Sequence, residues 1–546
     1  MRDEIRPKLL SALRNYNRAQ FGKDIIAGII VAIIALPLSI ALALASGVNP
    51  EQGLYTAIIA GFIIAALGGS DVQISGPTAA FATIVAGVVA ANGIDGLAVA
   101  TIMAGIILVV MGFCKFGKLI KFIPFTITTG FTTGIAVTLI IGQLKDFFGL
   151  TFTHSPIETM EKLTEAIHCF STFNVQAFLV GILSLVILIA VPKIKGINKI
   201  PPSLIAVIIS AAVVKLFDMN VNTIGSLYTI SGDLPKFSLP AFSFGTVKAV
   251  LPDAFTIAIL AAIESLLSCV VADGMVGKKH SSNTELVGQG VGNIASALFG
   301  GIPATGAIAR TAANVKNGGR TPVSGMVHAI VLLLILVVLM PYAALIPMPT
   351  IAAILFVVAY NMSEWREFVY LVKTSPKSDV FVLVLTFVLT VVFDLVVAIG
   401  VGIVLAAILF MAKMADTTDV QGWKYIEDDN DESLRDVPQG VFVYEITGPM
   451  FFGASDKILN MYIYKNAKVI IVRMSGVPAI DATAVHKLKA FCKKAEKKNV
   501  RVLFSHVNEQ PMRVFEKSGM LDKIGRENFC ANIDEALELS KEMARV

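Results

Sequence analysis

Ser75-Gly76-Pro77-Thr78-Ala79-Ala80-Phe81 places Gly and Pro at the start of an apolar segment that is too short to cross a bilayer comfortably. A second stretch of this kind, Gly301-Ile302-Pro303-Ala304-Thr305-Gly306-Ala307-Ile308-Ala309-Arg310, lies in the other half of the chain. In lipid an unpaired backbone N–H is costly, so a helix start at mid-membrane is tolerated only inside protein or beside a cavity. Two such starts in corresponding places predict the binding site of a transporter. Because helix N-termini attract negative charge, the expected ligand is an anion.

The composition is that of a polytopic membrane protein. Of the 546 residues, 55% are hydrophobic and only 16% are charged, which excludes a large soluble core. The net charge of +5 comes from Lys and Arg gathered at particular joints, so it indicates orientation in a membrane and not a nucleic-acid partner. The five cysteines are scattered without a CxxC pair, which predicts neither a disulfide framework nor a metal site.

Apolar blocks alternate with short polar joints between residues 24 and 415, after a basic segment at 1–23. A spanning helix needs about 20 apolar residues, and a half-helix needs fewer. We therefore expect about fourteen segments in a transmembrane transport domain at 24–415. They are predicted at 25–46, 53–68, 77–91, 97–114, 124–144, 175–192, 203–217, 251–273, 284–300, 304–315, 322–340, 348–362, 378–393 and 394–413.

Lys and Arg are unevenly distributed over the joints. They gather in every second joint, such as 115–121, whereas the joints 47–52 and 341–350 carry none. The positive-inside rule places the basic joints in the cytoplasm. Two longer segments on the other side, 145–174 and 218–250, do carry Lys, but the rule is weaker there. Both termini are therefore predicted to be cytoplasmic, in a multi-pass protein of the cell inner membrane.

The chain changes character after the last apolar block. Residues 416–440 are acidic and polar, which predicts a linker. Beyond it, β-branched runs at 441–446, 468–474 and 501–504 predict strands, and the spacing of 481–498 predicts a helix. Alternating strands and helices predict a small cytoplasmic α/β domain at 441–546.

The chain resembles the sulfate permease (SulP) anion transporter family over nearly its whole length. The motifs that carry the resemblance are Ala35-Leu36-Pro37-Leu38-Ser39-Ile40-Ala41-Leu42-Ala43 with Gly53-Leu54-Tyr55, then Ser75-Gly76-Pro77-Thr78-Ala79, then Ala309-Arg310-Thr311-Ala312-Ala313-Asn314, and finally Val477-Pro478-Ala479-Ile480-Asp481-Ala482-Thr483. The last motif looks like the signature of a STAS domain. Within the family, Ala261-Ala262-Ile263-Glu264-Ser265-Leu266-Leu267 with Asp273-Gly274-Met275 and Glu285-Leu286-Val287-Gly288-Gln289-Gly290 looks most similar to bacterial C4-dicarboxylate members.

The resemblance implies fourteen segments as two inverted repeats of seven, a core and a gate domain, and a homodimer. It also implies a small anion as the substrate. At Ala482, soluble STAS regulators carry a phosphorylatable serine, and Thr483 is a weak substitute. The domain is therefore expected to support trafficking, dimer contacts or a cytosolic partner and not a kinase switch.

Glu264 is a carboxylate near the middle of a hydrophobic segment, where ionisable residues usually mark an ion or proton path. Ser268 follows one helical turn later on the same face. In sodium-coupled relatives an acid and a hydroxyl at this spacing hold the cation, so the pair could bind sodium instead of passing a proton. The alternative is a Glu that pairs with a neighbour to join two helices. We predict proton or sodium coupling at Glu264 and Ser268.

Arg310 lies in the second half-helix and has three interpretations. It could pair with a substrate anion, neutralise Glu264, or extend to the cytoplasmic face, and the resemblance favours substrate electrostatics. The two half-helix starts are expected to offer backbone N–H donors and small side chains. Phe81 could line the pocket or serve only in packing. The predicted substrate-binding residues are Thr78, Ala79, Phe81, Thr305, Gly306, Ala307 and Arg310.

These features predict a secondary transporter that takes up C4-dicarboxylates such as succinate or fumarate with protons, by an elevator-type motion. The alternatives are sulfate, sodium-coupled bicarbonate symport and an uncoupled anion channel. Some proton-coupled relatives carry a Glu directly after the first-span proline, but this chain has Leu38 there, so proton coupling must rest on Glu264 or another acid. The sequence has no nucleophile–base pair, phosphate loop or metal cluster, so neither an enzyme nor a cofactor beyond H⁺ or Na⁺ is expected.

Overall fold

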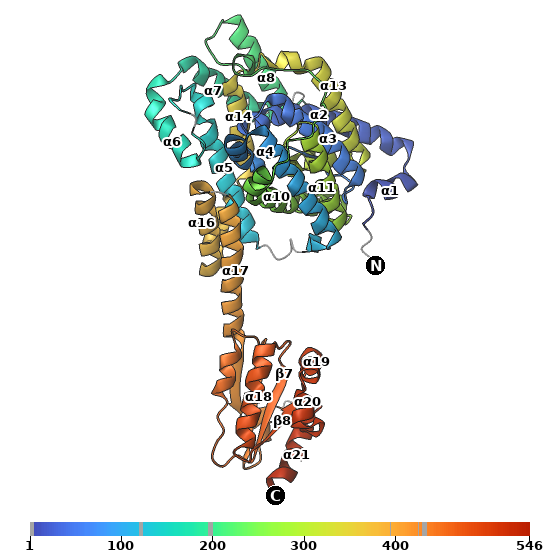
Figure 1. The fold of residues 1–546 in the computed structure, drawn as a ribbon, viewed down its shortest axis with the longest axis vertical. Coiled ribbons are helices and arrows are strands. Elements are labelled where there is room, and N and C mark those ends of the chain that lie inside the picture. Colours follow the sequence, from blue (N-terminus) through green and yellow to red (C-terminus); the bar gives the residue numbers. More distant parts are fainter. Residues whose placement is uncertain are drawn as a thin grey trace. The chain divides into compact units, whose positions relative to one another are not determined.

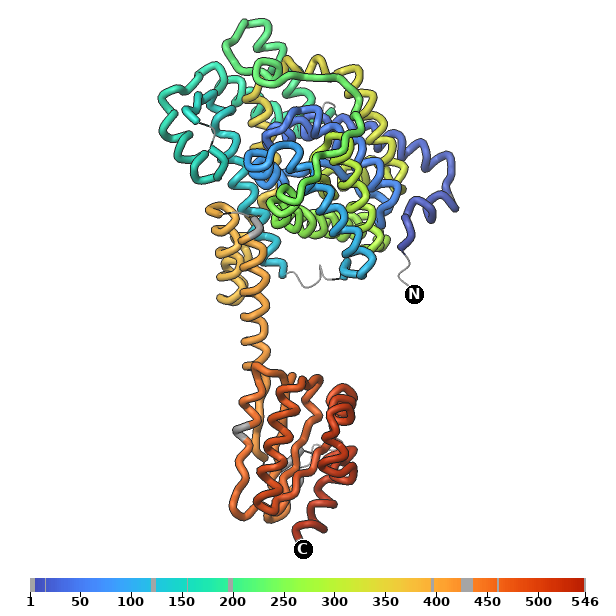
Figure 2. The backbone as a smooth tube through the Cα atoms, viewed as in Figure 1, coloured from blue at the N-terminus to red at the C-terminus, as the bar shows by residue number. Residues whose placement is uncertain are grey.

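The fold was analysed in a computed structural model that describes residues 5–118, 124–154, 156–194, 200–393, 395–423, 425–427 and 434–545. The chain divides into two compact units, Met1–Ile403 and Val404–Val546. Each unit is described by itself below (Figures 1 and 2).

The first unit is helical. Its helices are α1 (Lys8–Ala12), α2 (Arg18–Ala45), α3 (Pro50–Leu67), α4 (Ala79–Phe113), α5 (Phe125–Phe148), α6 (Thr159–His168), α7 (Val175–Ala190), α8 (Pro202–Leu216), α9 (Ile224–Leu227), α10 (Phe244–Val276), α11 (Ser282–Leu298), α12 (Ile308–Lys316), α13 (Val323–Ala343), α14 (Met348–Met362), α15 (Trp365–Thr374) and α16 (Lys377–Val392). α17 (Leu395–Thr417) continues from this unit into the second one. Among the described residues, 8 helices are long and apolar enough to span a membrane.

Each of the fourteen predicted segments overlaps a helix. Two of them, 77–91 and 97–114, are the two parts of α4, which break at Gly93, where φ is +69°. Five others are the shorter helices α8, α11, α12, α14 and α16, whose length falls below that of a full span. α2 begins at Arg18, seven residues before the predicted start of the first segment. The predicted boundary between the last two segments falls at Asp394, which lies outside the described residues.

The two broken stretches form a short antiparallel pair, β1 (Ser75–Gly76) with β2 (Thr305–Gly306). One polar face of α11 fastens the second stretch: Asn293 accepts a hydrogen bond from the Ala304 amide at 2.8 Å and donates one to the Ala304 carbonyl at 2.9 Å. Ser296 donates to the Ile302 carbonyl at 2.8 Å. Side chains thus satisfy backbone groups that would otherwise be unpaired inside the membrane.

Close packing of α4 against α11 depends on two facing glycines. A Cβ on Gly290 would lie 2.5 Å from the Gly105 carbonyl oxygen, and a Cβ on Gly105 would lie 2.6 Å from the Gly290 oxygen. Small residues at a contact allow membrane helices to approach backbone to backbone. This contact holds α11, and with it the polar face described above, against the second part of α4.

The second unit is an α/β domain with a five-stranded sheet in the order β3-β6-β7-β8-β9. Its strands are β3 (Asp419–Trp423), β6 (Val441–Thr447), β7 (Val469–Gly476), β8 (Arg501–Ser505) and β9 (Phe529–Cys530), with a separate pair of β4 (Tyr425–Glu427) and β5 (Leu434–Asp436). The helices α18 (Ala482–Glu496), α19 (Glu509–Lys517) and α20 (Met520–Ile524) contribute to one hydrophobic core, and α21 (Ile533–Arg545) contributes to another.

The predicted linker at 416–440 is wrong in part. Asp419–Trp423 forms β3, an edge strand that pairs antiparallel with β6. Its sequence, Asp-Val-Gln-Gly-Trp, has too few β-branched residues to indicate a strand, so the pairing with β6 and not local preference determines its structure. Of the acidic run 427–432, on which the linker prediction depended, Glu427 ends β4 and the remaining residues lie outside the described parts of the chain.

Candidate functional site

The β1–β2 pair brings together the two helix starts that the sequence singles out. Ser75 lies opposite Gly306 and Gly76 opposite Thr305, and the Ala307 amide donates to the Ile74 carbonyl at 2.9 Å. α4 begins at Ala79, two residues after the predicted start of that segment at 77. Thr305 and Gly306 were predicted to start the second half-helix, but they belong to β2, and α12 begins at Ile308. Strand pairing with Ser75 and Gly76 therefore delays this helix start.

Glu264 of α10 reaches the start of the first half-helix. The Thr78 hydroxyl donates a hydrogen bond to Glu264 Oε2 at 2.9 Å, and both residues are half-buried. Thr78 is the residue before α4, where a Thr side chain commonly caps the first-turn amides, but here it makes no such bond. Because the hydroxyl is directed to Glu264 instead, the first-turn amides of α4 remain without a side-chain cap.

The second half-helix is also uncapped. Ala307 precedes α12 and has no side chain that could accept a bond from the first turn. Ala79 and Ala307 at the two starts are small, so they leave the backbone accessible. Two uncapped helix starts that each follow a strand of the β1–β2 pair provide N–H donors and positive dipole ends that attract an anion.

The remaining predicted hydroxyls have protein partners. Ser268, fully buried, donates to Thr311 Oγ1 at 3.4 Å, and Thr305, also fully buried, donates to the Ala261 carbonyl at 3.0 Å. Ser268 and Glu264 thus lie one turn apart on α10, as predicted, but their side chains bond to different elements. Thr305 thus bonds β2 to α10, the helix that carries the Glu264 carboxylate.

Arg310 is buried, with 3% of its surface exposed, so it does not extend to the protein surface. A Cβ on Gly76 would lie 2.7 Å from Arg310 Nη1, so the guanidinium passes directly over the backbone of β1. Among the described residues it forms no ion pair with Glu264 or with any other carboxylate. A positive charge without a counter-ion therefore lies beside the strand that leads into α4.

Phe81 is buried, with 1% of its surface exposed, and is one of the largest fully enclosed side chains of the described chain. It does not line the cavity beside α4 that is described below. The structure therefore places Phe81 in the packed interior, beside the first turn of α4, whereas Ala79 occupies the first helical position.

Glu285, a buried acid of α11, forms a polar network that the sequence reasoning missed. Glu285 Oε1 accepts from Gln73 Nε2 at 2.7 Å, from Ser265 Oγ at 3.0 Å and from Gln289 Nε2 at 3.0 Å, while Oε2 accepts from the Gly69 amide at 2.8 Å. The network lies directly behind β2, because a Cβ on Gly306 would lie 2.3 Å from Gln73 Nε2. The missed signal is the polar spacing of Glu285, Gln289 and Asn293, one turn apart along α11.

A cavity of about 440 Å³ opens beside the first part of α4. It follows one face of that helix from Ala90 to Ala82, which is three residues beyond Ala79. Gln143 and Asp146 of α5 and Lys162 of α6 also line it. The cavity therefore ends about one helical turn from the start of the first half-helix.

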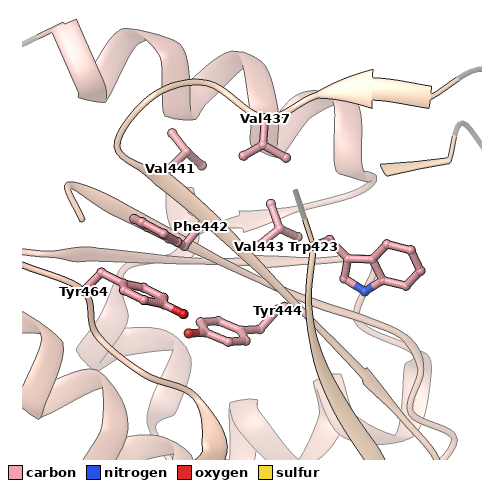
Figure 3. A pocket seen from close by; sticks show the side chains of 8 residues that line it. Trp423, Val437, Val441, Phe442, Val443, Tyr444 and Tyr464 are labelled. Carbon is pink, nitrogen blue, oxygen red and sulfur yellow. The ribbon is translucent and has the colours of Figure 1, made fainter. Parts of the chain in front are cut away.

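A smaller cavity of about 270 Å³ lies in the α/β unit beside β3 and β6. Trp423, Tyr444 and Tyr464 line it, and the ring of Phe442 stacks on that of Tyr464 with centroids 4.5 Å apart (Figure 3). No predicted site residue lines this cavity. Within the described parts of the chain, no cluster of three or more His, Cys, Asp and Glu side chains could hold a metal ion.

Comparison with known proteins identifies the family. The model described as "Sulfate permease family" matches residues 21–386, and the "STAS domain" model matches residues 434–536. The "Putative sulfate transporter YvdB" of Bacillus subtilis (strain 168) is 41% identical over 527 residues, which cover 96% of this chain and 98% of that relative. The "Bicarbonate transporter BicA" of Picosynechococcus sp. is 31% identical over 545 residues, which cover 94% of each chain.

The fold has a close counterpart among solved structures. The murine Solute Carrier 26 family member A9 anion transporter, in its inward-facing state, superposes with a TM-score of 0.89 over 98% of this chain and 94% of that chain. At 19% identity this likeness concerns the fold alone. It confirms the predicted polytopic helical membrane protein with a small C-terminal α/β domain. With the matches above, it follows that the chain belongs to the sulfate permease family and carries a STAS domain at its C-terminal end.

Proposed function

We propose that the protein is a secondary active transporter that moves a small anion together with a cation bound or released at Glu264. One observation carries the proposal: the Thr78 hydroxyl, at the start of the first half-helix, donates to the Glu264 carboxylate at 2.9 Å. A change in the charge of Glu264 therefore acts directly on the residue that precedes the uncapped amides of α4.

The anion is proposed to bind between the first turns of α4 and α12. Both turns lack a side-chain cap, and Ala79 and Ala307 at the two starts are small. Arg310, buried without a counter-ion among the described residues, adds a fixed positive charge beside β1. Buried charges are costly unless they are compensated, so an arriving anion gains more here than in water.

The cation is proposed to be a proton, with sodium as the second candidate. Glu264 is half-buried and accepts a hydrogen bond from Thr78 alone among the described residues, so its second carboxylate oxygen is available to take up a proton. Sodium would require the Ser268 hydroxyl as a further ligand, and that hydroxyl is directed to Thr311. Proton coupling needs no such rearrangement.

The preferred substrate is a C4-dicarboxylate, on the strength of the motifs around Glu264 and Glu285. The relatives described above are named for sulfate and for bicarbonate, which makes these two anions the direct competitors. The C4-dicarboxylate, sulfate and bicarbonate are all small anions of the kind that uncapped helix starts attract. The proposal also includes an elevator-type motion of a core against a gate and a homodimer. It places the protein in the inner membrane with cytoplasmic termini and gives the STAS domain a cytosolic partner.

Uptake into proteoliposomes tests the proposal. The full-length protein is supplied with labelled succinate, bicarbonate or sulfate, each under an inward proton gradient, an inward sodium gradient or neither. Concentrative uptake of one anion that requires the proton gradient supports the preferred form, and a requirement for sodium supports the alternative. Flux of an anion that ignores both gradients would indicate a channel and overturn cation coupling.

A further inference from the structure

The cavity beside α4 is lined by three polar side chains that form no hydrogen bond or ion pair within the described protein, although the charge of Lys145 also acts on one of them, Asp146. Gln143 is buried, with 6% of its surface exposed, and its amide makes no hydrogen bond to any described residue. Asp146 and Lys162 are half-buried, and neither side chain forms an ion pair or hydrogen bond within the described chain. Buried polar groups are normally satisfied, so the unpaired Gln143 amide, with Asp146 and Lys162 beside it, indicates a ligand or ordered water in this cavity.

The cavity extends from the ends of several helices towards the proposed anion site. It is lined by the C-terminal ends of α2 and α5, by residues of α6 and by the start of α14, at Leu44, Gly47, Asp146, Lys162 and Met348. With cytoplasmic termini, this is the outer face. Its inner end at Ala82 lies three residues, roughly 4.5 Å along the helix, beyond Ala79.

The chemistry of the three side chains is mixed. Lys162 and the Gln143 amide donate hydrogen bonds to negatively charged oxygen atoms, whereas the Asp146 carboxylate accepts one from an O–H group. An anion that carries its own acidic hydrogen matches both kinds of partner. Bicarbonate and a singly protonated dicarboxylate are such anions. Sulfate has no hydrogen to donate at neutral pH and carries a second negative charge that Asp146 would repel.

We propose that this cavity is an outer binding site, at Gln143, Asp146 and Lys162, that captures monovalent hydrogen-bearing carboxylate or carbonate anions before they reach the half-helix starts. The inference rests on the proposed transport function and narrows its substrate class. In this site Lys162 binds the anion, and Asp146 discriminates against sulfate.

Initial uptake rates in intact cells that lack their own transporters test the outer face directly, because every copy is oriented in one way. The probes are labelled bicarbonate and labelled succinate, each with unlabelled sulfate as a competitor. Lys162→Gln is expected to raise the KM for external anion about 5- to 20-fold with Vmax within twofold of the native chain. Lys162→Arg, which keeps the charge, is expected to retain the native KM.

Asp146→Asn should lower the inhibition constant of sulfate at least fivefold, because it removes the repelling carboxylate. The matched control is Lys236→Gln, in the segment between α8 and α10. The Lys236 side chain is 80% exposed and lies 3.5 Å from Asp233, and it does not line the cavity. This variant is expected to leave both constants unchanged.

The outcomes separate the two proposals. No uptake of bicarbonate, succinate or sulfate by the folded native chain would overturn the proposed function itself. Native uptake with unchanged constants in Lys162→Gln and Asp146→Asn would overturn the outer site alone. Equal loss of uptake in Lys162→Gln and Lys162→Arg, or a native preference for sulfate over both other anions, would also overturn it.

Discussion

Replacing Glu285 by glutamine keeps the size of the side chain but removes an acceptor that four neighbours share. The carboxylate accepts from Gln73, Ser265 and Gln289 through Oε1 and from the Gly69 amide through Oε2. A glutamine amide has one oxygen with two acceptor positions, so two of the four donors lose their partner. The new NH₂ group also faces donors.

The expected cost follows from this count. A buried donor left unpaired costs about 1–3 kcal/mol, so two of them cost roughly 2–6 kcal/mol. Glu285 is buried, with 1% of its surface exposed, so water cannot replace the lost partners easily. We therefore expect Glu285→Gln to lower the stability of the transmembrane unit severely. We also expect β2, which lies against Gln73, to become less well ordered.

Thermal unfolding of the purified full-length protein, followed by size-exclusion recovery after heating, measures this effect. The matched control is Thr101→Val. Thr101 is fully buried, and its hydroxyl donates to the Leu97 carbonyl at 2.7 Å within one helix. Loss of this hydroxyl leaves no buried donor without an acceptor, so it should lower the free energy of unfolding by less than about 1 kcal/mol. Equal unfolding midpoints for Glu285→Gln and Thr101→Val would refute the reasoning.

Three further predictions concern other parts of the chain. Gly290→Ala should destabilise the transmembrane unit by about 1–3 kcal/mol in the same assay, because its Cβ would lie 2.5 Å from the Gly105 carbonyl, and an unchanged midpoint would contradict the backbone contact. Hydrogen bonds from the Thr153 hydroxyl and amide lower the pKa of Glu165 to about 2, so its contribution to stability is full above pH about 4.3 and is lost as the pH falls towards 2. Thr153→Val raises that pKa, so pepsin at pH 3 should cleave the segment around α6 faster than in the native chain, and equal rates would contradict this. Leu488→Ala, at a fully buried position of α18, should cost the STAS domain about 2–5 kcal/mol in denaturant unfolding, and a loss below 1 kcal/mol would show that the site refills.

Much of the membrane unit could be predicted because its helices are set by local composition. Every predicted segment overlaps a helix, since runs of apolar residues in lipid have few alternatives to a helix. The strand at Asp419–Trp423 could not be predicted in this way. Its residues have weak β preference, and only pairing with β6, more than twenty residues later, holds them extended.

The candidate site could be predicted in its parts but not in its connections. Gly and Pro mark the two helix starts, and a lone carboxylate in an apolar segment marks Glu264. The bond from Thr78 to Glu264 joins residues 186 positions apart, and the bond from Gln73 to Glu285 joins residues 212 positions apart. Such contacts follow from tertiary packing, so no local sequence pattern predicts them. The extension of Thr305 and Gly306 as a strand likewise depends on their partners in β1.

The central claim is that one anion binds between the first turns of α4 and α12, next to Glu264. An experimental structure of the full-length protein with its transported anion tests this most directly. The account predicts density for the anion within hydrogen-bonding distance of the backbone amides at Ala79 and Ile308, in front of the paired strands β1 and β2. Density for the anion elsewhere in the membrane unit, with these amides bonded to protein groups, would contradict it.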